Sequence, residues 1–139
     1  CSLLVSRAVI ASVGLLREDY FMYYEDTDWS LRARNAGYRL LYAPESVVYH
    51  KVGMSSRTAR GNAPQLIYFN LRNRFTMVQR LASPRARLLS VLHLHYQLFS
   101  QFRMIMRRDY RRLEAVKYLL LGYRDALLRR LGPAPMVRG

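Results

Sequence analysis

The chain of 139 residues carries 23 Lys and Arg against 9 Asp and Glu, a net charge of +14, and 51% of its residues are hydrophobic. This length is enough for one domain with its own core, and the hydrophobic content excludes a wholly disordered chain. A single cysteine excludes an internal disulfide and is typical of a reducing compartment. The sequence lacks a zinc-ligand spacing, a phosphate-binding loop and a serine-nucleophile motif, so those enzyme classes are not indicated.

The charge is divided unevenly along the chain. Residues 1–50 hold five Arg and six acidic residues, whereas residues 51–139 hold 18 Lys and Arg and three acidic residues. A nearly neutral first part is therefore joined to a strongly basic second part. Such asymmetry indicates a polyanionic partner, either nucleic acid or an anionic membrane.

The first part reads as alternating helices and strands. Residues 3–5 are predicted as a strand and residues 6–13 as a short helix ended by Gly14. A helix over residues 26–36 stops at Gly37, and residues 38–42 and 46–49 then read as two short strands. His50 directly follows the second of these predicted strands. In an α/β fold, a strand-end histidine and a carboxylate at a helix start can face one cleft.

Three carboxylates, Glu25, Asp26 and Asp28, are gathered in the sequence YYEDTDW at residues 23–29. One interpretation is structural, because acids in a first helical turn cap free N–H groups and complement the helix dipole. The other is an acid–base or metal site, where clustered carboxylates raise one another's pKa. Arg32 stands four residues after Asp28 and can pair with it. Trp29 also has two interpretations, stacking on an acceptor sugar or closing the core beneath the helix.

The middle of the chain combines a loop and a helix. Residues 51–64 are rich in Gly, Ser and Pro and are predicted as a mobile loop, either a lid over a diphosphate or a plain linker. Residues 65–81 are predicted as a helix that contains Arg72. A guanidinium group binds phosphate in a bidentate manner, so Arg72 is a candidate diphosphate ligand, although a solvated helix face explains it nearly as well.

Two long amphipathic helices are predicted at the end, over residues 85–108 and 113–131. Polar and basic residues interrupt the first too often for a confident transmembrane span, which favours a helix lying in the membrane interface. The alternative is that the two helices pack on each other and on the core. The predicted apolar face of the helix over residues 85–108 consists of Leu88, Val91, Leu92, Leu98, Phe99, Phe102, Ile105 and Met106.

Several of these segments resemble family 2 glycosyltransferases. The resemblance is carried in order by residues 13–15, 20–29, 31–40 and 44–50 and by the later residues 72–74, about half of the chain. It is nearest to the bacterial rhamnosyltransferase and galactofuranosyltransferase branch. The resemblance implies an α/β fold: the C-terminal portion of a Rossmann-like GT-A domain, followed by an amphipathic helical tail. We accordingly divide the chain into a partial catalytic domain at 1–63, with the mobile loop at 51–63, and a basic helical tail at 64–139.

The resemblance also implies a reaction and roles for residues. A sugar, with rhamnose as the first candidate, would pass with inversion from a nucleotide-diphosphate donor to a lipid-linked or cell-envelope glycan. Asp26 would be the catalytic base, Glu25, Asp28, Trp29 and Arg72 would bind substrate, and His50 would ligate Mg²⁺ or Mn²⁺. The family's Asp-X-Asp metal motif lies upstream of the matched region. We therefore expect a truncated protein that is inactive alone.

A non-catalytic class remains open beside this one. The chain is alternatively a basic helical module that binds an anionic membrane or RNA. Its arginines lie along amphipathic helices rather than in a patch interleaved with aromatic residues, which favours membrane over nucleic acid. We therefore expect a cytoplasmic protein, peripheral on the inner face of the plasma membrane.

Overall fold

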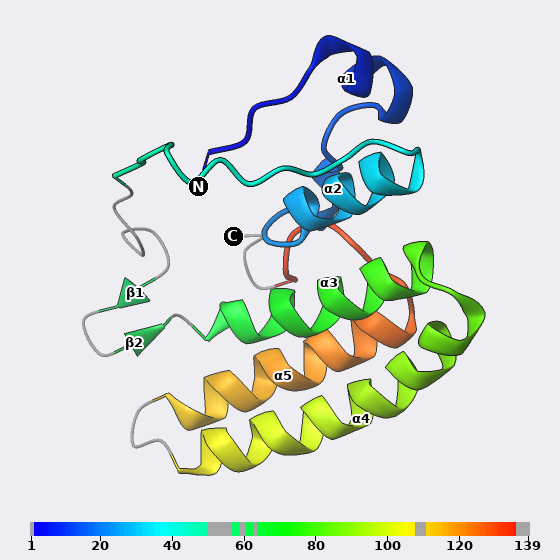
Figure 1. Ribbon diagram of the computed structural model, residues 1–139. Helices are drawn as coiled ribbons and strands as arrows, with labels where there is room; N and C mark the ends of the chain where they lie inside the picture. The colour runs from blue at the N-terminus through cyan, green and yellow to red at the C-terminus, as the bar shows by residue number, and fades with distance from the viewer. Residues whose placement is uncertain (1, 50–56, 59–60, 63, 108–110, 136–139) are drawn as a thin grey trace.

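Three long helices make up the larger part of the structure. The computed structural model describes residues 2–49, 57–58, 61–62, 64–107 and 111–135. Helices α3 (Gln65–Leu81), α4 (Pro84–Met106) and α5 (Arg112–Leu127) pack side by side, with α4 as the outermost of the three (Figure 1). The helices predicted over these stretches are confirmed, with ends that differ by up to four residues.

Local sequence signals explain where these helices begin and end. The side-chain oxygen of Ser83 accepts a hydrogen bond from the backbone N–H of Ala86, and Pro84 occupies the first helical position of α4. Both are favoured helix-start residues, because Ser satisfies a free N–H group and Pro has none to satisfy. Helix α5 is followed by Gly132 with a φ of 93°, a left-handed conformation that glycine adopts at little cost.

The core of the bundle is apolar and is shared by all three helices. Gly122 of α5 lies so close to α3 that a Cβ atom there would stand 3.0 Å from both Cα and the carbonyl oxygen of Tyr68. This close approach lets the two helices bury a continuous row of side chains. The buried members of the core are Leu71, Phe75, Leu94, Ile105, Ala115, Leu119 and Ala126.

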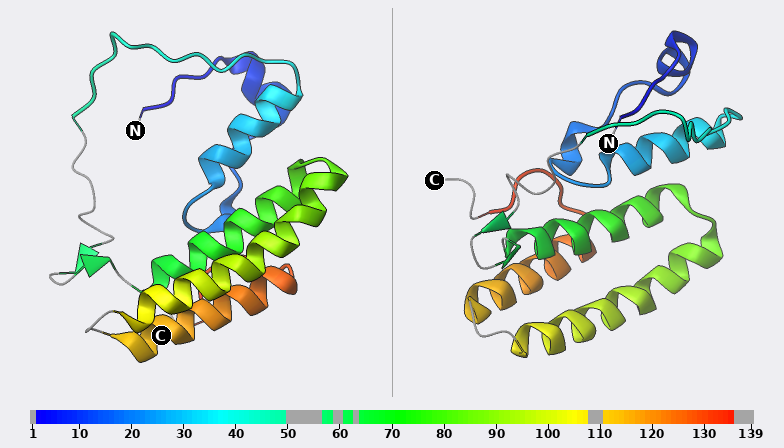
Figure 2. Two further views of the ribbon diagram at one scale, coloured as in Figure 1. Left: turned by 60° about the horizontal axis from the view of Figure 1, so that its bottom comes forward. Right: turned by 60° about the vertical axis from the view of Figure 1, so that its left-hand side comes forward.

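The first part of the chain forms a smaller layer beside α3 (Figure 2). It contains α1 (Arg7–Val13), the 3₁₀ turn η1 (Glu18–Tyr20) and α2 (Glu25–Asn35). Ser6 caps α1, since its side-chain oxygen accepts a hydrogen bond from the backbone N–H of Val9. The helix predicted over 26–36 is confirmed within one residue.

Asp19 makes polar contacts that help to fix this layer to the bundle. The Asp19 carboxylate accepts a hydrogen bond from Arg80 of α3 at 3.1 Å and from Arg17 at 2.7 Å. The hydrogen bond from Arg17, supported by that from Arg80, lowers the pKa of the Asp19 carboxyl. The backbone carbonyl of Asp19 also accepts from the N–H of Gly132, so the chain beyond α5 is held at the same place.

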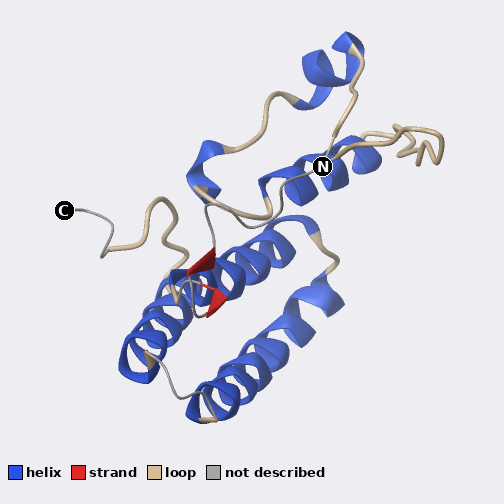
Figure 3. Ribbon diagram, turned by 90° about the vertical axis from the view of Figure 1, so that its left-hand side faces the viewer, coloured by secondary structure: helices blue, strands red, loops and turns tan. Residues whose placement is uncertain are grey.

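The predicted α/β fold is wrong for the part of the chain that the structure describes. Residues 3–5, 38–42 and 46–49 form no strands, and Figure 3 shows the described chain as helices and loops apart from one short pairing. That pairing joins β1 (Arg57–Thr58) to β2 (Gly61–Asn62) in antiparallel register. The physical reason is that a strand requires a hydrogen-bonded neighbour. Residues 38–49 are extended and rich in Val, Leu and Tyr, but they have no such neighbour among the described residues.

The predicted apolar face of α4 is divided between two sides of the helix. Leu98 and Val91 are partly buried in the bundle core and Ile105 is fully buried there, whereas Leu92 and Phe99 are exposed. The alternative that the last two helices pack on each other and on the core is therefore confirmed. Among the described residues, no helix is both long enough and apolar enough to cross a bilayer.

Candidate functional site

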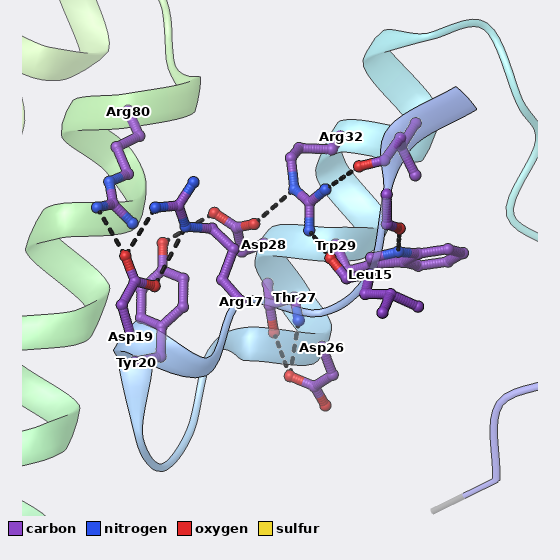
Figure 4. Close-up of polar contacts among 12 residues, drawn as sticks. Leu15, Arg17, Asp19, Tyr20, Asp26, Thr27, Asp28, Trp29, Arg32 and Arg80 are labelled. Carbon is purple, nitrogen blue, oxygen red and sulfur yellow. Dashed lines mark hydrogen bonds and ion pairs between the residues drawn. The ribbon is translucent and has the colours of Figure 1, made fainter. Parts of the chain in front are cut away.

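The acidic cluster lies in the first turn of α2, as predicted, but its carboxylates occupy different environments (Figure 4). Asp26 is exposed. One of its oxygens accepts from the backbone N–H of Thr27 at 2.6 Å and from the Thr27 hydroxyl at 3.2 Å. Figure 4 shows the Asp26 carboxylate apart from the Asp28 cluster, with its second oxygen outside any marked contact. Asp26 is therefore the member of the cluster that a substrate hydroxyl can reach.

Asp28 is instead buried at 1% exposure and is fully engaged. One oxygen accepts from the Tyr20 hydroxyl at 2.8 Å, and the other accepts from Arg32 Nε at 2.8 Å. The predicted Arg32 pair is thus present, but it is partly buried rather than at the surface. Burial, together with the bond to Asp28, raises the pKa of Tyr20 well above its usual value. Tyr20 therefore keeps its proton and serves as a permanent donor to the carboxylate.

Arg32 and Trp29 connect this cluster to the loop that follows α1. The Arg32 guanidinium donates to the carbonyl oxygens of Val13 and Leu15. Trp29 is buried, and its indole N–H donates to the carbonyl of Gly14 at 2.7 Å. This is the position that the core interpretation of Trp29 requires. The predicted stacking of Trp29 on an acceptor sugar has no support in this arrangement.

The backbone just before α2 is strained. Phe21, Tyr23 and Tyr24 have φ values of 66°, 64° and 72°, and none is glycine. A left-handed conformation costs a residue with a side chain roughly 1–2 kcal/mol. Strain of this kind persists only where surrounding contacts determine it, and it is concentrated at functional sites. The backbone segment that leads into Glu25 and Asp26 is therefore held in place by the tertiary structure rather than by local preference.

Asn73 of α3 makes most of the hydrogen bonds that fix this backbone segment. Its side chain is fully buried, and its amide nitrogen donates to the carbonyl oxygens of Tyr20, Met22 and Tyr23 at 3.1, 2.7 and 3.0 Å. Its amide oxygen accepts from Arg72 Nε at 2.8 Å. One side chain thus satisfies backbone groups throughout the strained turn.

Arg72, predicted as a phosphate ligand, is also fully buried and is occupied by the protein. Besides the bond to Asn73, its guanidinium donates to the carbonyls of Tyr20 at 2.9 Å and Gly132 at 2.7 Å, and to the Tyr68 hydroxyl at 3.0 Å. The Tyr68 hydroxyl donates in turn to Asp125, a buried carboxylate on α5. The Arg72 guanidinium is therefore engaged by internal partners, and its role as a diphosphate ligand stays a prediction.

Glu25 presents a different kind of signal. Within the part of the chain that the structure describes, its Oε2 atom is buried and has no hydrogen-bond partner. Buried polar atoms are nearly always hydrogen-bonded, so this orphan acceptor beside the exposed Asp26 is unusual. Phe21 and Tyr23, in the strained segment that precedes Glu25, have exposed side chains.

The predicted metal site is not assembled by the described residues. These residues contain no group of three His, Cys, Asp or Glu side chains that could hold a metal ion, and His50 lies outside them. The loop predicted at 51–64 lies mostly outside them as well. The roles of His50 and of the divalent ion stay predictions.

Sequence reasoning missed Tyr20, Asn73 and Asp125 as the residues that organise the site. Asn73 contacts carbonyl groups about fifty positions earlier in the chain, and Asp125 contacts a tyrosine 57 positions earlier. No periodicity or spacing signals such pairs. The only available signal was the presence of Asn73 in the Arg-Asn-Arg segment that resembles the glycosyltransferases.

Comparison with known proteins gives one informative similarity. The chain is 30% identical over 100 residues to a dTDP-rhamnosyl transferase, RfbF, of Shigella flexneri, a match that covers 65% of this chain and 34% of that protein. The chain spans about a third of the length of this relative. The similarity relates the chain to a glycosyltransferase. No protein-family model and no solved structure matches it.

Proposed function

We propose that this chain carries the acceptor side of the active site of an inverting glycosyltransferase, with Asp26 as the catalytic base. The observation that carries the proposal is the exposed Asp26 carboxylate in the first turn of α2, directly after a strained backbone segment that buried side chains hold in place. Similarity to a dTDP-rhamnosyl transferase supports the reaction class. The acceptor oxygen forms a bond to the anomeric carbon while the bond from that carbon to the diphosphate breaks. Asp26 takes the acceptor proton.

The residues around Asp26 support it or contact the substrate. Asp28 holds the start of α2 through Tyr20 and Arg32, so it supports Asp26 rather than reaching substrate. Glu25, the neighbour of Asp26 in the same helical turn, supports the carboxylate that meets the acceptor. The exposed rings of Phe21 and Tyr23 offer apolar faces against which a sugar ring can pack.

The finer assignments follow from the same proposal. The donor is a nucleotide-diphosphate sugar, with dTDP-rhamnose as the first probe because the relative is a dTDP-rhamnosyl transferase. The acceptor is a cell-envelope or polyprenyl-linked glycan, and the protein works at the cytoplasmic face of the plasma membrane. His50 would contribute to binding a divalent ion that offsets the charge of the leaving diphosphate.

Replacement of Asp26 by Asn in the full-length protein tests the base. The substitution keeps the shape of the side chain and removes its basicity, so we expect kcat for transfer from dTDP-rhamnose to fall by about 10²–10⁴-fold. Donor binding, measured by calorimetry, should change little. Glu45→Gln, an exposed acid outside the cluster, is the matched control.

Two results would contradict the proposal. Near-normal turnover by the Asp26→Asn protein would move the base to another residue, with Glu25→Gln as the next variant. Absence of transfer by the full-length wild-type protein, over a panel of nucleotide sugars, would favour the non-catalytic alternative.

A further inference from the structure

Helix α4 has two apolar sides, and the bundle uses only one of them. Leu94 and Ile105 are buried in the bundle core, with Val91 and Leu98 packed against it. Its opposite side keeps a second set of large apolar side chains in solvent, with exposed fractions between 61% and 70%. These are Leu88, Leu89, Leu92, Tyr96 and Phe99.

The exposed set forms one continuous stripe. At 3.6 residues per turn, positions 85, 88, 89, 92, 96, 99, 103 and 107 all fall on one side of a helix. We define this stripe as the outer face of α4. The apolar part from Leu88 to Phe99 is about 16 Å long at 1.5 Å per residue. The outermost place of α4 in the bundle leaves this face without a partner helix (Figures 1 and 3).

Arginines stand at both ends of the stripe. Arg85 lies at its beginning and Arg103 and Arg107 lie at its end, and all three are exposed. The Arg103 guanidinium lies 5.8 Å from the centre of the Phe99 ring, so a cation and an apolar ring are presented together. Helix α4 contains no acidic residue. The face is therefore apolar in its centre and positively charged at its ends.

This charge pattern decides between candidate occupants. A second copy of the chain would bring together two faces of the same sign in a protein of net charge +14, which opposes self-association. An anionic bilayer complements both features, because apolar side chains enter the acyl boundary while arginines reach the lipid phosphates. We propose that the outer face of α4 docks on an anionic phospholipid bilayer. The helix lies along the membrane surface, since its inner side is already buried in the bundle.

The outer face of α4 is a defined surface for the proposed membrane location. The contact is then made by one stripe of one helix rather than by the whole basic tail. It rests on that location but not on sugar transfer, because vesicle binding is measured without donor or acceptor. Failure of the transferase assay and failure of the docking surface are therefore distinguishable.

The test is flotation of the full-length protein with vesicles of phosphatidylglycerol and phosphatidylethanolamine, compared with vesicles of phosphatidylcholine. We expect binding to the anionic vesicles and a loss of at least about tenfold in partition coefficient between about 50 mM and about 500 mM salt. Each of Arg85, Arg103 and Arg107 replaced by Gln should weaken binding at low salt by about fivefold. The triple variant Leu88→Gln, Leu92→Gln, Phe99→Gln should no longer float.

A matched control separates the outer face from general hydrophobicity. The triple variant Leu40→Gln, Leu41→Gln, Tyr42→Gln removes three apolar side chains outside the bundle that are also more than half exposed, and it should bind like wild type. Because all six side chains are exposed, both variants should keep the urea unfolding midpoint of the wild-type protein. Unchanged flotation of the outer-face variant would overturn the proposal. So would equal binding to neutral vesicles, or a dimer in light scattering that this variant abolishes.

Discussion

At the scale of single residues, the site depends on side chains that never reach solvent. Asp28 and Arg72 are among the largest fully buried side chains, and the charged group of each is hydrogen-bonded to other groups of the protein. Buried charges are tolerated only when they are paired and hydrogen-bonded. Asp26 is left as the exposed carboxylate of the cluster, in the first turn of α2. The backbone just before that turn is held by hydrogen bonds from Arg72 and Asn73.

Removal of the Asn73 side chain should lower the free energy of unfolding by more than its small size suggests. Asn73→Ala removes the side-chain partner of the Met22 and Tyr23 carbonyls and of the Arg72 Nε, so we expect the free energy of unfolding to fall by about 2–4 kcal/mol. The Tyr20 carbonyl keeps its hydrogen bond from Arg72. Urea denaturation followed by circular dichroism measures the change. Asn70→Ala is the matched control, because Asn70 lies in the same helix, is exposed, and donates only within its own turn to Leu66. Equal losses in the two variants would contradict the role of Asn73.

At the scale of elements, the contact between α3 and α5 depends on a glycine. Gly122 lies inside α5, where glycine is a poor helix former by about 1 kcal/mol relative to alanine. The benefit of alanine is offset because its Cβ atom would stand 3.0 Å from the Tyr68 backbone, which cannot move as a side-chain tip can. The sequence tolerates a weak helix former here because only that residue lets the helices approach.

Gly122→Ala should therefore destabilise the protein despite the better helix propensity. Overpacking of a close contact costs about 1–3 kcal/mol, so we expect a net loss of up to about 2 kcal/mol. A fall in the thermal unfolding midpoint would demonstrate it. Lys117→Ala, an exposed substitution in the same helix, should leave the midpoint unchanged or slightly higher. A stabilised Gly122→Ala protein would mean that the helices separate easily at this point.

At the scale of the whole molecule, buried tyrosines link the parts of the fold. Tyr20 joins η1 to α2 through Asp28, and Tyr68 joins α3 to α5 through Asp125. Burial raises the pKa of Tyr20, Tyr68 and Tyr118, and the hydrogen bonds to Asp28 and Asp125 raise those of Tyr20 and Tyr68 further. The folded state therefore holds these protons more tightly than the unfolded state does.

The sign of the resulting pH dependence follows from proton linkage. Above the unfolded tyrosine pKa near about 10, the unfolded chain releases protons that the folded chain keeps, so stability falls as pH rises by about 1.4 kcal/mol per pH unit for each retained proton. This contribution is fully present below that pH. Urea unfolding between neutral pH and about pH 11 checks the slope. Tyr20→Phe should reduce it, whereas Tyr42→Phe, at an exposed position, should leave it unchanged.

The sequence by itself determined the helices and the position of the candidate base in one of them. Ser6, Gly37 and Ser83–Pro84 mark helix ends through local backbone chemistry, so these ends were predictable from short windows, whereas α5 ends at Leu127, four residues before the predicted end. The position of Asp26 in the first turn of α2 was predictable for the same reason.

Only the tertiary structure decided which polar side chains are buried and which apolar ones are not. The extended residues 38–49 carry a strand-like composition but find no hydrogen-bonded neighbour in the described chain, so local propensity predicted strands that are not formed. Helix α4 is apolar on both sides, and periodicity cannot say which side meets α3 and α5. The contacts of Asn73 and Arg72 join segments about fifty positions apart. Such contacts depend on how the helices pack, which no local pattern encodes.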